Sequence, residues 1–478
     1  MVTIDGRTLG AAGVVTVARP GEHGRASAEP VTIADAAMTR AVGAYRAASA
    51  AQGPIYGRTT GVGANGSVPV GSNPGNGLRL IRSHSSGGGE PVAGDVARAM
   101  LVVRLNQLAA GGSGADPAWL TAIARALNDG LTPEFGVLGG IGTTDLTALA
   151  ATALTLIGER PWRGGLTRAL LAAPVADATA LAFLSSNALT LGHAALVHQD
   201  LAALLDAELE VAALSHLALS GSAQPYSEAV QAARPHPGQR ATAARLRKLL
   251  GSDASRPAAR VQDPYGLRAL PQVHGPAVEA LAALGRVLTV EINAAAENPL
   301  ISVAGDVLHN GNFHGAYLAQ ALDSVRLALC ADASLSQARL AALVDPDRTG
   351  LRPFLADGLA GSSGVMIVEY TASSALAEMR SLAAPVSLGN VVLSRGAEEH
   401  AAFSPQAARA AAAMVPRLRT LLACELVAAV RALRQRGVVP AGPRLRALHD
   451  EALKQLPADD TDRPLDTDIA GAEQVIGV

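Results

Sequence analysis

Apolar residues recur at helical spacing through most of the chain after residue 177. Positions i, i+3, i+4 and i+7 are apolar along several long segments, and this repeat of about 3.6 residues predicts α-helices. Some of these segments are apolar on more than one face, which favours burial in a large bundle. The predicted helices are Ala178–Leu219, Ala277–Glu297, Tyr317–Val344, Met366–Leu382 and Pro405–Arg434.

The first third of the chain is less regular. Val14–Ala18 predicts a short strand and Asp35–Gln52 a helix. The glycine-dense stretch Ile55–Gly77 predicts a long loop of the kind that often carries function. Asp145 is suited to cap a helix that begins at Leu146. We therefore expect a loop-rich N-terminal part, residues 1–177, and a helical core with C-terminal helices, residues 178–478.

Composition excludes several classes of protein. The 478 residues are 49% hydrophobic and 17% charged, which argues against disorder. A formal net charge of −2 argues against binding to nucleic acid or to an anionic membrane. Charged residues interrupt the long apolar stretches, and two cysteines cannot form a disulfide framework. We expect a soluble, cytoplasmic protein without a membrane span.

Three positions in polar surroundings are candidates for chemistry. Tyr56 follows an apolar residue in the glycine-rich loop and can act as a general base if its pKa is lowered; the alternative is a tyrosine that anchors the loop. His84 stands among serines, but a lone histidine is more often structural. Arg268, close to Gln262 and Tyr265, can bind a carboxylate; the alternative is a solvated arginine on a surface turn.

Two further segments combine histidine with polar or acidic residues, Asn312–His314 and Glu398–His400. The second resembles half of a metal site. No second histidine-rich segment stands at metal-ligand spacing from it, so we expect no bound metal ion.

In chain order, these segments resemble motifs of the histidine/phenylalanine ammonia-lyase family over essentially the whole sequence. Ile55–Gly63 (IYGRTTGVG) resembles the family's YGxNTGFG loop, with its Asn and Phe replaced. Val261–Val273 (VQDPYGLRALPQV) is similar to the family's QDPYSLRCxPQV run. Further similar segments are Glu291–Leu300 (EINAAAENPL), Asn310–Gly315 (NGNFHG), Ser363–Ala372 (SGVMIVEYTA) and Asp462–Leu465 (DRPL).

The resemblance implies a mainly α fold with a long-helix bundle of the ammonia-lyase/fumarase-like type. It also implies a homotetramer whose active sites combine several subunits and bind a small, histidine-like molecule. It assigns Tyr56 as the base that removes the β-proton and Arg268 as the group that binds the carboxylate. The remaining implied contacts are Gln262 and Tyr265 near that carboxylate, Phe313 at the reacting centre, and His84, Met379 and Glu398 around an imidazole.

The sequence departs from the family at its defining feature. Family members cyclise an Ala-Ser-Gly triplet into the electrophile methylidene-imidazolone, whereas this chain has Gly142-Thr143-Thr144 when aligned on Asp145-Leu146. Cyclisation needs a very tight turn at the third residue, which glycine permits and a β-branched threonine hinders. The family's LALxNGT run is altered too, with Ser185 at the Asn position unless Asn187 substitutes for it. We expect the electrophile to be absent.

Loss of the electrophile alone suggests a changed leaving group. The electrophile adds to a substrate amine, but a quaternary ammonium has no lone pair and already departs as a neutral amine. A trimethylammonium betaine of histidine, hercynine or ergothioneine, fits such a site, as in the electrophile-less ergothionase branch. Aromatic faces of Tyr56, Tyr265 and Phe313 can shelter the cation. The alternatives are a histidine ammonia-lyase-like enzyme, a biosynthetic enzyme for another imidazole metabolite, and a non-catalytic binding homologue.

The absence of the electrophile is testable by intact-mass spectrometry of the purified protein. We expect the mass encoded by the sequence, because Thr144 hinders ring closure. A deficit of two water molecules, which cyclisation and dehydration would remove, would overturn this expectation.

Overall fold

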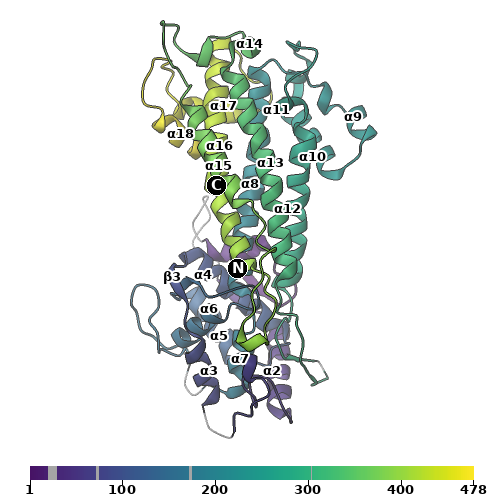
Figure 1. Cartoon of the computed structure of the whole chain (residues 1–478), viewed down its shortest axis with the longest axis vertical. Helices are drawn as coiled ribbons and strands as arrows, with labels where there is room; N and C mark the ends of the chain where they lie inside the picture. Colours follow the sequence, from purple (N-terminus) through teal and green to yellow (C-terminus); the bar gives the residue numbers. More distant parts are fainter. Residues whose placement is uncertain (20–29, 72–74, 172–174, 303, 478) are drawn as a thin grey trace. The chain divides into compact units, whose positions relative to one another are not determined.

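The protein is described here by a computed structural model, which covers residues 1–19, 30–71, 75–171, 175–302 and 304–477. Residues 72–74 of the expected loop Ile55–Gly77 lie outside this range. The described residues are mainly α-helical, as the hydrophobic pattern predicts (Figure 1). They group into two compact units that are not consecutive in sequence. Unit 1 comprises Met1–Gln199, Leu284–Leu322 and Pro385–Arg409, and unit 2 comprises Asp200–Ala283, Asp323–Ala384 and Ala410–Val478.

Unit 1 combines short helices with pairs of short strands. Strand β1 (Val2–Ile4) pairs in parallel with β2 (Val31–Ile33), with Val2 opposite Val31. The antiparallel pairs are β3 (Gly88–Pro91) with β4 (Gly136–Leu138), and β5 (Leu300–Ile301) with β6 (Val307–Leu308). The helices of this unit are α1 (Ala11–Ala18), α2 (Asp35–Ala50), α3 (Asn76–His84), α4 (Gly94–Ala110), α5 (Ala118–Asn128), α6 (Leu146–Leu156) and α7 (Asp177–Leu184), with 3₁₀ turns η2 (Gly63–Asn65) and η6 (Ser394–Gly396).

Helix α4 forms the centre of unit 1. Every residue from Val96 to Ala109 is buried, and α1, α2 and α5 pack around it. A helix buried on all faces must satisfy any polar side chain internally. Arg104 does so: its guanidinium pairs with Glu297 at 2.9 Å and donates to the carbonyls of Ala182 and Phe183 at the end of α7. This buried pair ties α7 to the segment that follows residue 296.

Unit 2 is a bundle of helices. It contains the shorter elements η3 (Gln224–Tyr226), α9 (Glu228–Ala233), α10 (Pro237–Leu250), η4 (Gly251–Ser255), α11 (Tyr265–Arg268), α14 (Pro346–Thr349), η5 (Pro353–Leu355), α15 (Val368–Leu382), α17 (Pro443–Gln455) and α18 (Asp466–Ile476). Parts of four long helices complete it: α8 (Ala188–Ala218), α12 (Leu270–Ile292), α13 (Ala316–Val344) and α16 (Ser404–Arg436). Within unit 2 these four lie side by side (Figure 1).

Two sequence predictions are wrong in the first half of the chain. Val14–Ala18 is the end of helix α1 and not a strand, because burial against α4 outweighs the weak β-preference of valine. The expected helix Ala178–Leu219 is two helices, α7 and α8, separated at Ser185–Asn187. The Ser186 hydroxyl accepts from the Ala188 amide, so this residue serves the start of the second helix.

The predicted cap of α6 is correct in position but not in chemistry. Asp145 is the N-cap residue, yet its side chain makes no hydrogen bond to the first turn of α6. Its carboxylate accepts from the amide and the hydroxyl of Thr190, both at 2.9 Å, and burial raises its pKa to about 6. Asp145 therefore joins α6 to α8.

Two helical stretches, Asp177–Ala218 and Ala316–Val344, are long and apolar enough to cross a membrane by length and composition alone. Each stretch contains an apolar window of 18 residues. Within that window, 83% of the first stretch and 50% of the second are buried inside the protein. Buried core helices share this composition with membrane spans, so composition does not separate the two here.

Candidate active site

A cavity of about 590 Å³ in unit 1 collects most of the residues that the sequence marks as chemical. The described side chains that line it come from loops and helix ends that are far apart in the sequence. They include Tyr56, His84, Thr143, Thr144, Ser185, Asn298, Phe313, His314, Ser394, Glu398, Glu399 and His400. Cavities lined by polar and aromatic groups on loops are the usual place for a small-molecule site.

Tyr56 is held at the edge of this cavity by the loop that precedes η2. Its hydroxyl oxygen accepts a hydrogen bond of 2.6 Å from the Gly63 amide. Burial raises the pKa of Tyr56 and the charge of Glu398 raises it further, whereas the Gly63 amide favours the phenolate. The net effect leaves the pKa of Tyr56 above its ordinary value in the free chain, which favours the neutral phenol.

Gly63 lets the Tyr56 loop approach the Glu398 loop closely. A Cβ on Gly63 would lie 2.3 Å from the Ser394 hydroxyl and 3.3 Å from a Glu398 oxygen, so a larger residue does not fit without movement. Ser394 accepts from the Ala64 amide at 2.8 Å. The glycine thus brings the phenol and the carboxylate into one cavity.

Histidines and carboxylates share the other walls of the cavity. His84 contacts the Leu80 carbonyl through Nδ1 at 2.9 Å; a carbonyl only accepts, so Nδ1 carries the proton and Nε2 is the acceptor. His314 Nε2 lies 3.0 Å from His400 Nδ1. Burial and the neighbouring His400 both lower the pKa of His314, which favours its neutral form. This mixture of donors and acceptors suits a polar heterocycle.

The segment Gly142–Thr144 has an unusual backbone. Thr144 has φ +97°, a left-handed conformation that disfavours a β-branched residue. Its amide donates to Asn187 Oδ1 at 3.0 Å, and the Gly142 carbonyl accepts from the Gly315 amide at 2.8 Å. Hydrogen bonds to neighbouring loops therefore hold a strained conformation in place.

Gly142 is enclosed as well as strained. It has φ +89°, and a Cβ there would lie 2.9 Å from the Ser404 hydroxyl and 3.0 Å from the Ala402 Cβ. The Ser404 hydroxyl is buried and has no hydrogen-bond partner among the described residues. Ser404 fills the space that an alanine methyl at position 142 would occupy, and nothing in the local sequence indicated this role.

The structure separates the two candidates for the family asparagine. Asn187 bridges two loops: besides accepting from Thr144, its amide donates to the Phe313 carbonyl at 2.6 Å. Ser185 instead accepts from the Asn298 amide at 3.0 Å and lines the cavity. Asn298 and Ser394, which we had not singled out as site residues, line it too.

The remaining predicted contacts belong to unit 2. Gln262 and Tyr265 are exposed, and the Arg268 guanidinium carbon lies 4.5 Å from the centre of the Tyr265 ring. Met379 on α15 is fully buried in the single chain, and its expected imidazole contact stays a prediction. Among the described residues that line the unit 1 cavity there is no lysine or arginine.

Comparisons with known proteins identify the family to which the chain is similar. A family model described as aromatic amino acid lyase matches residues 9–454. Histidine ammonia-lyase from Sorangium cellulosum is 35% identical over 98% of this chain and 96% of its own length. Histidine ammonia-lyase from Geobacillus kaustophilus is 36% identical over 87% of this chain and 86% of its own length.

Solved structures are similar along nearly the whole chain. Ergothionase from Treponema denticola, in complex with desmethyl-ergothioneine sulfonic acid, has a TM-score of 0.90 at 26% identity and covers 99% of this chain and 98% of its own. Histidine ammonia-lyase from Trypanosoma cruzi has a TM-score of 0.88 at 27% identity, with coverage of 99% and 93%.

The backbone strain at Thr144 is measurable. Replacing a threonine by glycine in an ordinary conformation costs about 0.5–1 kcal/mol, whereas relief of a left-handed conformation returns about 1–3 kcal/mol. We expect Thr144→Gly to keep or raise the apparent Tm, and the matched Thr143→Gly, which has no positive φ, to lower it. Equal or greater loss of Tm in Thr144→Gly would show that residue 144 is not strained.

Proposed function

We propose, because this chain belongs to the aromatic amino acid lyase family, that it eliminates trimethylamine from a trimethylammonium betaine of histidine. The family consists of carbon–nitrogen lyases that act on small amino acids, and the curated relatives quoted above are histidine ammonia-lyases.

The geometry around Gly142-Thr143-Thr144 carries the proposal. Ring closure would need the Thr144 nitrogen to attack the Gly142 carbonyl. That nitrogen donates to Asn187, and the carbonyl accepts from Gly315. Position 144 carries a β-branched side chain, and Ser404 lies against position 142, where family members have alanine. The strained and crowded backbone supports an enzyme without the methylidene-imidazolone group, and the contact with Ser404 disfavours alanine at position 142 without forbidding it.

A betaine needs no electrophile. Tyr56 takes a proton from the β-carbon, the electrons of that C–H bond form the Cα=Cβ double bond, and the C–N bond breaks. The nitrogen keeps the electron pair and leaves as neutral trimethylamine, while a urocanate-type acrylate remains. The adjacent imidazole ring stabilises negative charge that develops on the β-carbon.

A cationic substrate also offsets the raised pKa of Tyr56. In the free protein, burial and Glu398 raise this pKa, which favours the neutral phenol. A permanent trimethylammonium beside the phenol favours the phenolate by charge attraction. The rings of Tyr56 and Phe313 line the same cavity and offer their faces to the cation.

Glu398 and His84 support recognition of imidazole. Glu398 presents a carboxylate to the cavity, and His84 presents the acceptor Nε2. Imidazole N–H groups donate to such acceptors, and a phenyl ring cannot. Glu399 and His400, adjacent on the same loop, add polar partners for the ring.

We assign the substrate carboxylate to Arg268 of another copy of the chain, because the described lining of the cavity offers no lysine or arginine. A guanidinium binds a carboxylate through two parallel hydrogen bonds. The assignment requires an oligomer, for which we propose the homotetramer that the resemblance implies. A monomer by light scattering at micromolar concentration would contradict it.

The substrate is testable by incubation of the purified enzyme with histidine, hercynine and ergothioneine. We expect trimethylamine and the ultraviolet absorbance of a conjugated acrylate from a betaine. Tyr56→Phe should lower kcat by at least about 10²-fold with little change in substrate affinity, as general-base catalysis requires. The matched Tyr45→Phe, on α2 and outside this cavity, should leave the rate unchanged.

Other outcomes favour other functions. Release of ammonia from histidine, with both betaines untouched, would make the chain a histidine ammonia-lyase like its curated relatives. Binding of betaines without turnover would favour a non-catalytic binding protein. Turnover of neither class would favour a biosynthetic enzyme for another imidazole metabolite.

The charge of Glu398 should be visible in the pH profile. Because Tyr56 must be deprotonated and its pKa is raised, kcat/KM should rise with pH through the neutral range. Glu398→Gln removes a charge that raises this pKa, so the rising limb should move to lower pH and selection of imidazole over phenyl should weaken. Glu399→Gln, whose charge is not among the causes that shift the Tyr56 pKa, is the control for the pH shift alone. An identical shift in both variants, or none, would contradict the assignment.

A further inference from the structure

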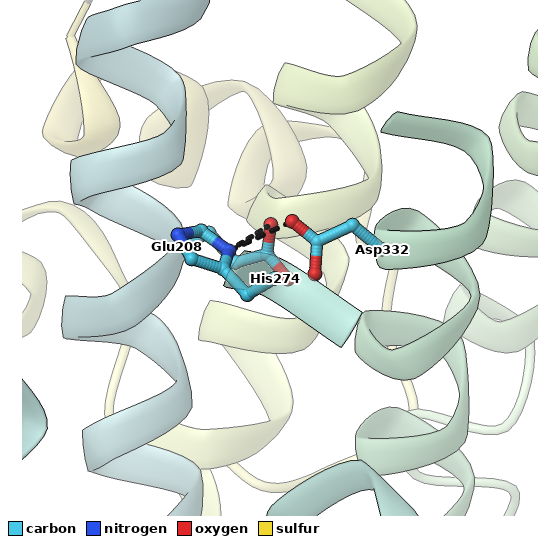
Figure 2. Close-up of side chains that lie close together, drawn as sticks. All are labelled: Glu208, His274 and Asp332. Carbon is cyan, nitrogen blue, oxygen red and sulfur yellow. Dashed lines mark ion pairs between the residues drawn. The ribbon is translucent and has the colours of Figure 1, made fainter. Parts of the chain in front are cut away.

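A second group of chemical side chains lies in unit 2, apart from the residues of the candidate active site. Glu208 on α8, His274 on α12 and Asp332 on α13 point toward one another (Figure 2). Each side chain is at most 1% exposed. A carboxylate that is buried to this degree must be paired, protonated or bound to a metal ion.

The three side chains are close enough to converge on one small cation. His274 Nδ1 lies 2.7 Å from Asp332 Oδ2 and 3.8 Å from Glu208 Oε2. Two ligands of one ion, each at 2.0–2.2 Å, lie about 3–3.6 Å apart in octahedral or tetrahedral geometry, so side-chain adjustments of about 1 Å or less would bring both pairs to that spacing. One ligand atom from each of the three residues lies within 4.8 Å of the others.

The same atoms lack well-directed hydrogen bonds. His274 Nδ1, Glu208 Oε2 and both oxygens of Asp332 are buried without a hydrogen-bond partner among the described residues. The 2.7 Å contact between His274 and Asp332 is an ion pair only when the ring is protonated. Buried polar atoms left in this way indicate a missing partner at the point that they share.

The charges of the surrounding side chains also favour a bound cation. Arg339 pairs with Glu208 at 3.1 Å and with Glu425 at 2.7 Å, and all three side chains are fully buried. The Glu425 oxygens also accept from Ser215 and Ser336, both at 2.6 Å. Together with His274 and Asp332, the group holds three carboxylates. When all three carboxylates are ionised, one arginine and a protonated histidine leave one negative charge unbalanced, whereas a divalent cation beside a neutral His274 balances the charge.

We propose that Glu208, His274 and Asp332 bind one divalent transition-metal ion that joins helices α8, α12 and α13. One imidazole nitrogen with two carboxylates suits Zn²⁺ and similar first-row ions. This site has no local spacing motif, because each ligand lies on a different helix, and the expectation of no bound metal ion rested on local spacing alone. The site is structural, and the proposal does not depend on the substrate of the enzyme.

The test uses the full-length chain purified from medium supplemented with Zn²⁺. Elemental analysis should find about one Zn²⁺ per chain, and Co²⁺ added to chelator-treated protein should give the visible absorption of a bound ion. His274→Gln and Asp332→Asn should each weaken Co²⁺ binding by at least about 10-fold. His216→Gln, which changes another buried histidine of unit 2, should bind Co²⁺ as the wild type does.

Several results would overturn the proposal. One is wild-type protein with negligible metal and no Co²⁺ absorption. Another is equal Co²⁺ binding by the wild type and both ligand variants, which would show adventitious binding elsewhere. If the variants do not fold, the wild type decides: the apparent Tm after refolding should be higher with Co²⁺ than with Mg²⁺, and equal values would refute the site.

Discussion

The side-chain amide of Asn187 is the contact on which the arrangement of the candidate active site depends. It accepts from the Thr144 amide and donates to the Phe313 carbonyl, so a single planar group fixes two loops that are far apart in sequence. Asn187 lies at the start of α8, directly after the break that ends α7. Arg104 fixes the chain next to that break. Its guanidinium binds the carbonyls of Ala182 and Phe183 near the end of α7 and the Glu297 carboxylate. The buried Arg104–Glu297 pair and the buried Asn187 amide therefore together position the strained backbone at Thr144.

Much of this could be predicted from local sequence, and the limits have physical causes. The helical periodicity correctly predicted a mainly α fold, and the polar motifs led to Tyr56, Phe313 and Glu398, which line one cavity. Periodicity failed at Val14–Ala18, where tertiary burial overrides the preference of valine. It also failed at Ser185–Asn187, because a short polar interruption of a long apolar pattern carries little periodic signal.

The rest of the site depends on contacts between distant segments, which a single sequence does not reveal. The Ser404 side chain lies against Gly142, and the Ser394 side chain lies against Gly63. More than two hundred residues separate the two members of each pair in the sequence. Met379, a position transferred from a family motif, is buried in the single chain, which the motif alone did not indicate. Motifs identify residue types and approximate neighbourhoods, whereas burial and partners are properties of the folded chain.

The contact between Ser404 and Gly142 has an evolutionary consequence. While the Ser404 hydroxyl occupies the space beside residue 142, alanine at position 142 is sterically disfavoured, and while residue 142 is glycine, nothing selects against the serine. The fitness effect of a substitution at either position thus depends on the residue at the other. Such epistasis means that alanine at position 142 is accommodated more easily after Ser404 has moved or changed, so the order of two substitutions decides which of them is tolerated.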